Sequence, residues 1–105
     1  MTTFDKREQA FEAQFVHDEE VRFKAVARSN KLLGNWAAAL LGLTGEAAAA
    51  YANGLVTAEL EHQSGEQTLR AVSKDLAAKG ISQAEVAAKM SELLHVALEQ
   101  IKAGN

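Results

Sequence analysis

The sequence predicts an all-α protein, and three of its features point to that class. The 105 residues include no proline, and about one residue in five is alanine, a composition that favours helices. Runs of β-branched and aromatic residues, which indicate strands, are missing. Apolar residues instead recur at steps of three and four, which places them on one face of a helix. Successive helical stretches joined by short turns predict a four-helix bundle.

The first predicted helix is much longer than the others and runs from Phe4 to Leu41. This stretch contains no proline and one glycine, Gly34. At about 1.5 Å per residue it would extend roughly 57 Å, about twice the length of the other helices. We therefore expect its N-terminal half to protrude or to be mobile. Its second half is expected to pack in the core, with Trp36 as an anchor and an apolar stripe made of Phe23, Val26, Leu33, Ala37, Leu40 and Leu41.

Three phenylalanines mark the N-terminal half of this helix. Phe4, Phe11 and Phe15 share one side because they are separated by steps of seven and four. The next position on that side is Glu19, inside the charged run 17–20, and a stripe that packed in the protein's own core would not be broken there by charge. One interpretation is that the three rings fold back as ordinary core. The charged interruption and the length of the helix favour a second interpretation, in which the three rings bind in a groove of another protein.

Three further helices follow, separated by turns that contain glycine. The second is expected at residues 46–62 with Thr44 as its cap, the third starts near Gly65 and ends near Gly80, and the fourth opens at Ser82. Their apolar faces are expected to line the core: Tyr51, Leu55, Ala58 and His62 in the second helix, Leu69, Val72 and Leu76 in the third, and Val86, Met90, Leu93, Leu94, Ala97 and Ile101 in the fourth.

Capping boxes support the starts of the last two helices. Ser64 with Gln67, and Ser82 with Glu85, each place a hydroxyl residue three positions before a side chain that can reach back to the backbone. This arrangement satisfies two N–H groups that have no partner within the helix.

Composition and charge exclude several classes of function. Without cysteine there is no disulfide framework, thiolate nucleophile or cysteine metal site. The longest apolar run, residues 36–43, is too short to span a bilayer, and the N-terminus lacks the pattern of a signal peptide, so we expect a cytoplasmic protein. The net charge is −3, but residues 1–31 carry six charges of each sign. A charged yet neutral segment argues against a phosphate-binding tail.

Two Glu-x-x-His pairs, Glu59 with His62 and Glu92 with His95, are similar to the ligand pattern of di-iron helical bundles. On a helical wheel Glu92 and His95 fall on the polar side, and Glu59 and His62 lie in the last turns of their helix. The pairs are not expected to converge. We predict surface residues, with no metal and no cofactor.

A basic face, Lys24, Arg28 and Lys31, could in principle meet nucleic acid. Acidic residues lie immediately upstream and no aromatic residues interleave, so a solvated helix face is expected and no nucleic-acid partner. Residues 41–45 lack the spacing and the lysine of a P-loop. Nothing pairs a serine, threonine or tyrosine with a base in a recognisable order, so the sequence does not indicate an enzyme.

Five short stretches carry a resemblance to a known family: FDKREQAFE at residues 4–12, HDEE at 17–20, RSNKLLG at 28–34, WA at 36–37 and TGE at 44–46. Over its whole length the chain resembles the zeta subunit, or intrinsic inhibitor, of the F-type ATP synthase in alphaproteobacteria. The resemblance implies a four-helix bundle whose N-terminal segment enters an interface between the alpha and beta subunits of the catalytic head and stops ATP hydrolysis. The function would be similar to that of the mitochondrial ATPase inhibitor protein.

The resemblance also implies a division of the chain, with an inhibitory segment at residues 1–18 and the bundle at residues 19–105. The protein would lie at the cytoplasmic face of the inner membrane through the synthase, without inserting into the membrane. An alternative function is a helical bundle that binds a small ligand, either a nucleotide or a metal. The partner-binding residues would be Phe4, Phe11 and Phe15, which fill apolar depressions, and Asp5, Lys6, Arg7, Glu8 and Glu12, which select register and partner by charge.

Overall fold

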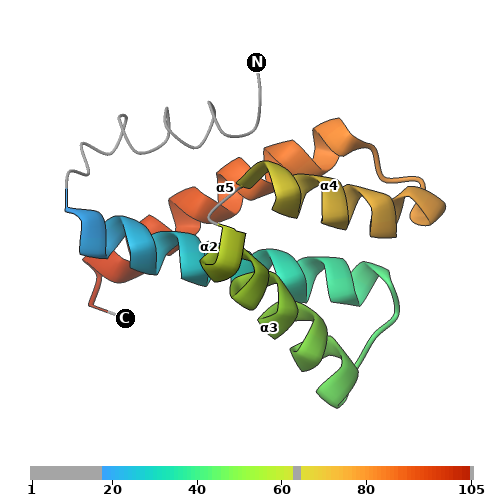
Figure 1. Ribbon diagram of the computed structural model, residues 1–105, viewed down its shortest axis with the longest axis horizontal. Coiled ribbons are helices and arrows are strands. Elements are labelled where there is room, and N and C mark those ends of the chain that lie inside the picture. The colour runs from blue at the N-terminus through green and yellow to red at the C-terminus, as the bar shows by residue number, and fades with distance from the viewer. Residues whose placement is uncertain (1–17, 63–64, 105) are drawn as a thin grey trace.

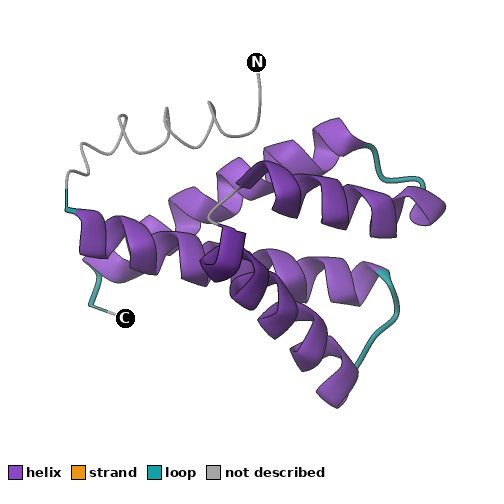
Figure 2. Cartoon of the chain, in the orientation of Figure 1, coloured by secondary structure: helices purple, strands orange, loops and turns teal. Residues whose placement is uncertain are grey.

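The computed structural model describes residues 18–62 and 65–104, and nearly all of these residues are helical (Figures 1 and 2). No strand occurs in these two stretches, so the predicted all-α class is confirmed for them. None of the described helices is both long enough and apolar enough to span a membrane. The elements are α2 (Glu19–Leu40), α3 (Gly45–His62), α4 (Gly65–Leu76), the short 3-10 helix η1 (Ala77–Lys79) and α5 (Gln83–Lys102).

The start of α2 corrects the prediction for the first helix. α2 begins at Glu19, so one unbroken helix from Phe4 to Leu41 is wrong at Asp18. Asp18 has an extended backbone, with φ −80° and ψ 117°, and its side chain caps the first turn. Aspartate is a strong N-cap residue because its carboxylate accepts hydrogen bonds from backbone N–H groups that lack a partner in the helix. The expected protrusion or mobility of the N-terminal half concerns residues outside the described ones.

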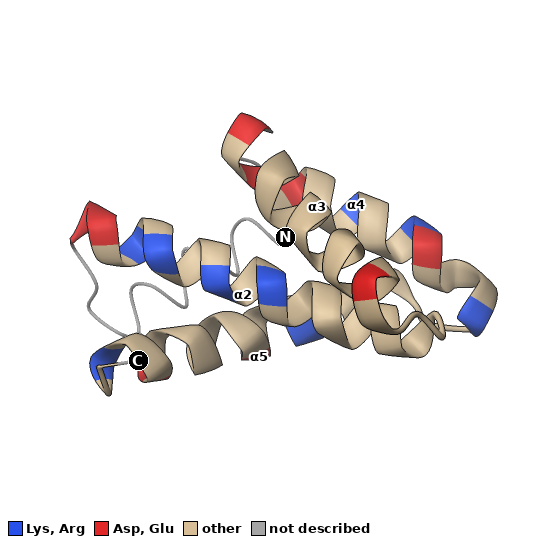
Figure 3. Ribbon diagram, turned by 90° about the horizontal axis from the view of Figure 1, so that it is seen from below, with Lys and Arg blue, Asp and Glu red and all other residues tan. Residues whose placement is uncertain are grey.

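α2 is the central helix of the described structure and packs mainly against α3 and α5. α5 runs antiparallel to α2, and α4 lies beside α5 (Figures 1 and 3). α3 crosses the second half of α2, and the first turns of α2 extend beyond this crossing in both views. The helices α2 to α5, together with η1, are called the helical domain below.

The crossing of α2 and α3 depends on two small residues. A Cβ atom added to Gly34 would lie 2.4 Å from the Ala52 Cα atom and 2.8 Å from the Ala52 Cβ atom. Both distances are shorter than van der Waals contact, so the two backbones approach as closely as they do because position 34 has no side chain. Ala37, Ala38 and Ala52 are fully buried around this point.

The main apolar core draws on α2, α3, α4 and α5. Trp36 packs against it, as predicted, and the Lys89 Nζ atom lies 5.6 Å from the centroid of the Trp36 ring, within the range of a cation–π contact. Its buried members are Leu33, Ala37, Leu55, Leu69, Val72, Leu76, Val86, Ala87 and Met90.

A second, smaller cluster joins the first half of α2 to the last turns of α5. Ala25, Leu94 and Leu98 are buried there. The partly buried side chains packed around them are Val21, Val26 and Ile101. The predicted apolar face of the last helix is therefore confirmed, and Leu98, which the prediction omitted, belongs to it.

Other positions differ from the predicted core faces. Phe23 is 59% exposed and Leu40, the last residue of α2, is 37% exposed. Ala58 is exposed on α3, whose buried face is formed by Ala52, Leu55 and Glu59. The reason on α3 is the crossing at Gly34, which turns the Ala52 side of α3 inward.

Two glycines end helical segments in the predicted way. Gly42 has φ 78°, and the N–H of Leu43 donates to the Ala38 carbonyl at 2.9 Å. Gly80 has φ 76°, and the N–H of Ile81 donates to the Leu76 carbonyl at 3.3 Å. Both are left-handed caps of the kind in which glycine avoids a steric penalty.

The predicted helix starts have different outcomes. The capping box at the start of α5 is confirmed: the N–H of Glu85 donates to Ser82 Oγ at 3.1 Å, and the N–H of Ser82 donates to Glu85 Oε1 at 3.2 Å. Thr44, the predicted cap, directly precedes α3, and its backbone carbonyl accepts from the N–H of Ala48 at 3.4 Å. The third predicted helix does start at Gly65, but Ser64 lies outside the described residues.

Candidate functional site

The predicted partner-binding residues precede the part of the chain that the structure describes. The described chain begins at Asp18, the last residue of the predicted inhibitory segment, and that junction with α2 is the part of the candidate site whose geometry is known. The residues outside it, which remain predictions, are Phe4, Asp5, Lys6, Arg7, Glu8, Phe11, Glu12 and Phe15.

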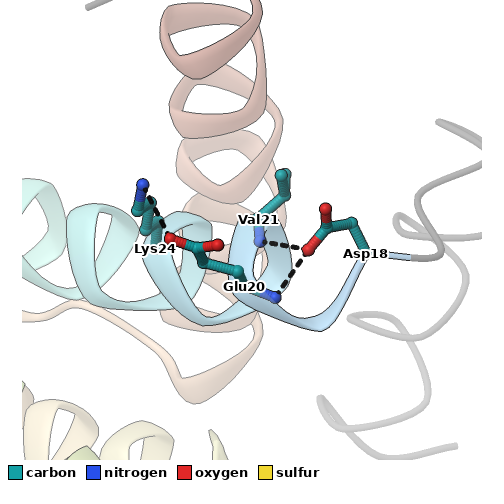
Figure 4. A network of polar contacts seen from close by, with 4 residues as sticks. All are labelled: Asp18, Glu20, Val21 and Lys24. Atoms are coloured by element: carbon teal, nitrogen blue, oxygen red, sulfur yellow. Dashed lines mark hydrogen bonds and ion pairs between the residues drawn. The ribbon is translucent and has the colours of Figure 1, made fainter.

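Asp18 fixes the junction through its side chain and its backbone (Figure 4). Its Oδ1 atom accepts hydrogen bonds from the N–H of Glu20 at 2.8 Å and from the N–H of Val21 at 3.3 Å. Its carbonyl accepts from the N–H of Arg22 at 3.0 Å. The carboxylate therefore caps the start of α2.

The first turn of α2 is acidic and solvated. Glu19 and Glu20 follow the cap directly, and negative charge is favourable at a helix N-terminus. The Lys24 Nζ atom lies 3.3 Å from Glu20 Oε1, with both side chains largely exposed (Figure 4). An exposed pair of this kind contributes well under about 1 kcal/mol. The junction is thus held by the cap more than by ion pairing.

The basic face of α2 lies where the sequence places it. Lys24 and Lys31 are exposed and Arg28 is partly exposed. Figure 3 shows basic positions along α2, after an acidic stretch at its start. The predicted solvated face is confirmed for the two lysines.

Phe23 does not lie where the sequence predicts it. It was expected in the core, but it belongs to neither apolar cluster and most of its surface is exposed. A signal was present in the sequence, because Phe23 follows the charged stretch at residues 17–20 by only three positions. The close approach of α3 at Gly34 lies three turns after Phe23.

The two Glu-x-x-His pairs have different surroundings. Glu92 and His95 are exposed, as predicted, and the Lys89 Nζ atom lies 2.7 Å from Glu92 Oε2. Glu59 is only 7% exposed, so the expectation of a surface residue is wrong there. It shares the inward face of α3 with Leu55, four residues earlier. The side chain of His62 is not described, and no group of three or more potential metal ligands occurs among the described residues.

A polar contact links α3 to α4. The Tyr51 hydroxyl donates to Asp75 Oδ2 at 2.8 Å. Burial of the ring raises the pKa of the Tyr51 hydroxyl above its ordinary range, and the hydrogen bond and charge of Asp75 raise it further. Both effects keep the proton on tyrosine, so this pair serves as a structural link between the helices.

Comparison with known proteins identifies a family that this chain matches. The chain matches the family described as ATPase inhibitor subunit zeta over residues 1–100. No curated protein and no solved structure matches it. The match covers both the residues that precede Asp18 and nearly all of the helical domain. The chain therefore belongs to the ATPase inhibitor subunit zeta family.

Proposed function

We propose that the protein inhibits ATP hydrolysis by the F-type ATP synthase by inserting residues 1–18 at an interface between the alpha and beta subunits of the catalytic head. The observation that carries this proposal is the family match over residues 1–100, which includes the segment with its three phenylalanines. The start of α2 at Glu19 supports it, because the capped helix begins where the predicted segment ends.

The mechanism is the obstruction of a moving interface. A rotary ATPase cycles its catalytic interfaces between open and closed forms, and a helix held in one of them prevents the next change. Phe4, Phe11 and Phe15 would occupy apolar depressions, while the charged residues between them would fix the register. The helical domain would stay outside the cleft, where its width stops further entry.

The energetics favour a reversible inhibitor. Burying a phenylalanine ring gives about 1.5 to 3 kcal/mol. Ordering a segment of this length costs about 1 kcal/mol or more for each residue that was disordered beforehand. The rings alone would not offset that cost, so backbone and polar contacts must contribute. Such a balance gives an inhibitor that enters and leaves according to the state of the enzyme.

This role needs no cofactor and no catalytic residue in the chain. Its partners would be the alpha and beta subunits, and its location would be the cytoplasmic face of the inner membrane, through the synthase. All chemistry would remain in the catalytic head.

A hydrolysis assay on catalytic head depleted of its inhibitor tests the proposal. Replacing Phe11 and Phe15 together by alanine should abolish inhibition while the melting temperature of the helical domain barely changes. Leu60→Ala is a matched control, because it also removes an exposed large apolar side chain, from α3. Inhibition by the double variant at the same concentration as the unchanged protein would show that the segment is not the effector. A large fall in melting temperature would show that the two rings are core.

A further inference from the structure

Asn53 and Gly54 form an Asn–Gly pair in the middle of α3. This pair is typical of turns, because both residues tolerate the left-handed backbone conformation, and glycine is among the poorest helix formers. In the structure α3 nevertheless runs unbroken from Gly45 to His62. Both residues of the pair are exposed, and neither apolar cluster includes them. The pair therefore contributes no side chain to the core and weakens α3 locally.

An asparagine followed by a glycine is open to attack by its own main chain. The backbone N–H of Gly54 loses its proton to water, its nitrogen bonds to the Asn53 Cγ atom, and the side-chain nitrogen takes up a proton and leaves as ammonia. Water then opens the cyclic imide at either of its carbonyls, which leaves aspartate or isoaspartate at position 53. Glycine favours ring closure because it has no Cβ atom beside the attacking nitrogen. Nothing lies within 4 Å of the place that such an atom would occupy at Gly54.

The helix holds this reaction back while α3 is intact. In an α-helix each backbone N–H donates to the carbonyl four residues earlier, and the fixed backbone angles keep the nitrogen away from the preceding side chain. The attack therefore requires local opening of α3. Its rate in the folded protein is the rate in the unfolded chain multiplied by the fraction of molecules in which α3 is open around the pair.

Among the described helices, α3 has the fewest buried residues for its length. It has 18 residues, but only Ala52, Leu55 and Glu59 are buried among those whose side chains are described. The 12 residues of α4 include five buried ones. A region with few buried contacts opens at a lower free energy than the rest of the core. Asn53 and Gly54 lie between Ala52 and Leu55, so the pair separates two of the three residues that hold the helix.

We propose that Asn53 is a site of spontaneous deamidation that reacts when α3 opens, and that isoaspartate at this position loosens the crossing of α2 and α3. Isoaspartate adds one carbon atom to the backbone of α3, because the main chain then runs through the former side chain. That atom lies between Ala52, which packs at Gly34, and Leu55, which packs in the main core. Both residues cannot keep their positions, since the added atom changes the rotation and rise between them. Aspartate leaves the backbone unchanged. The reaction needs only water and does not depend on the proposed function.

Mass spectrometry of the digested full chain tests the site after incubation in mildly alkaline buffer. Conversion replaces an amide by a carboxyl group, and chromatography separates the aspartate and isoaspartate peptides. In native buffer Asn53 should convert at least about tenfold more slowly than in urea, a factor that corresponds to about 1.4 kcal/mol of opening free energy. Asn35 is the internal control, because it is also exposed but is followed by the bulky Trp36.

Two glycine variants separate the dipeptide from the helix that protects it. Gly34→Ala leaves the Asn–Gly pair intact but adds a Cβ atom 2.4 Å from the Ala52 Cα atom. It should accelerate conversion of Asn53 in native buffer and leave the rate in urea unchanged. Gly54→Ala places a methyl group beside the attacking nitrogen and should slow conversion under both conditions. Equal rates in native buffer for Gly34→Ala and the unchanged protein would show that opening at the crossing does not control the reaction.

Other outcomes would overturn the site or its chemistry. Conversion of Asn53 as fast in native buffer as in urea would show that the helix gives no protection. Conversion no faster than that of Asn35, even in urea, would exclude a selective site. Aspartate without isoaspartate would exclude ring closure.

The consequence for the crossing is measured on the purified isoaspartate form, with Asn53→Asp as the matched control. The isoaspartate form should melt at least about 4 °C below the unchanged protein, whereas Asn53→Asp, on the exposed side of α3, should melt close to it. Equal melting temperatures of the isoaspartate form and Asn53→Asp would refute the loosened crossing.

Discussion

The crossing of α2 and α3 predicts that the same substitution, glycine to alanine, destabilises the protein at one position and stabilises it at another. Gly34→Ala adds one Cβ atom at a point 2.4 Å from the Ala52 Cα atom. That neighbour is backbone, so no rotamer change can relieve the overlap and the two helices must separate. Overpacking of this kind costs about 1 to 3 kcal/mol, and a backbone neighbour places the cost at the upper end of that range. The gain in helix propensity from glycine to alanine offsets only about 1 kcal/mol.

Gly54 in α3 is the matched control, because nothing lies within 4 Å of a Cβ atom added there. The same substitution at Gly54 should stabilise the protein by about 0.5 to 1 kcal/mol through helix propensity. We therefore expect Gly34→Ala to lose about 1 to 2 kcal/mol, a difference of about 1.5 to 3 kcal/mol between the variants. Urea unfolding followed by circular dichroism measures both values. Equal stabilisation of the two variants would refute the close crossing.

Three other predictions concern the cap, the core and the link between α3 and α4. Asp18→Ala should cost about 1 kcal/mol in thermal unfolding and Asp18→Asn much less, since asparagine also caps helices; equal losses would show that the cap does not stabilise α2. Leu94→Ala should cost about 2 to 5 kcal/mol because it leaves a cavity in the second cluster, whereas Glu92→Ala on the exposed side of α5 should cost well under about 1 kcal/mol; similar losses in urea unfolding would contradict the assigned faces. Because the folded-state pKa of Tyr51 is raised, the contribution of Tyr51 to stability is complete below the unfolded pKa of about 10 and is lost as the pH rises above that value. The difference in stability between the unchanged protein and Tyr51→Phe should therefore narrow in alkaline unfolding measurements. A constant difference would be inconsistent with the link to Asp75.

Local sequence signals predicted the features that depend on few residues. The capping box of Ser82 and Glu85 involves one turn, and the left-handed caps at Gly42 and Gly80 depend on the freedom of a single residue, so each could be identified without knowledge of the neighbouring helices. The apolar face of the last helix was equally clear because it is broad. The break at Asp18 had a local signal too, since an aspartate followed by two glutamates is typical of a helix start.

The positions of Phe23 and Glu59 could not be predicted in the same way. Each depends on where α3 crosses α2, and that point is set by the approach of Gly34 to Ala52, which are 18 residues apart in the chain. A helical wheel indicates which residues share a face but not which part of that face a neighbour covers. The candidate site divides similarly: the junction at Asp18 has a known geometry, whereas the roles of residues 4–15 stay predictions.

The cap at Asp18 also fixes the residue at which the helical register of α2 begins. In an unbroken helix each residue is rotated by about 100° from the one before, so inserting a single residue turns everything on one side of the insertion. An extended residue does not transmit that rotation. Insertions or deletions ahead of Asp18 therefore leave the direction of the Phe23 ring and of the faces packed on α3 and α5 unchanged. Helical register begins anew at Glu19, so the length of the preceding segment can vary without any compensating change in the domain.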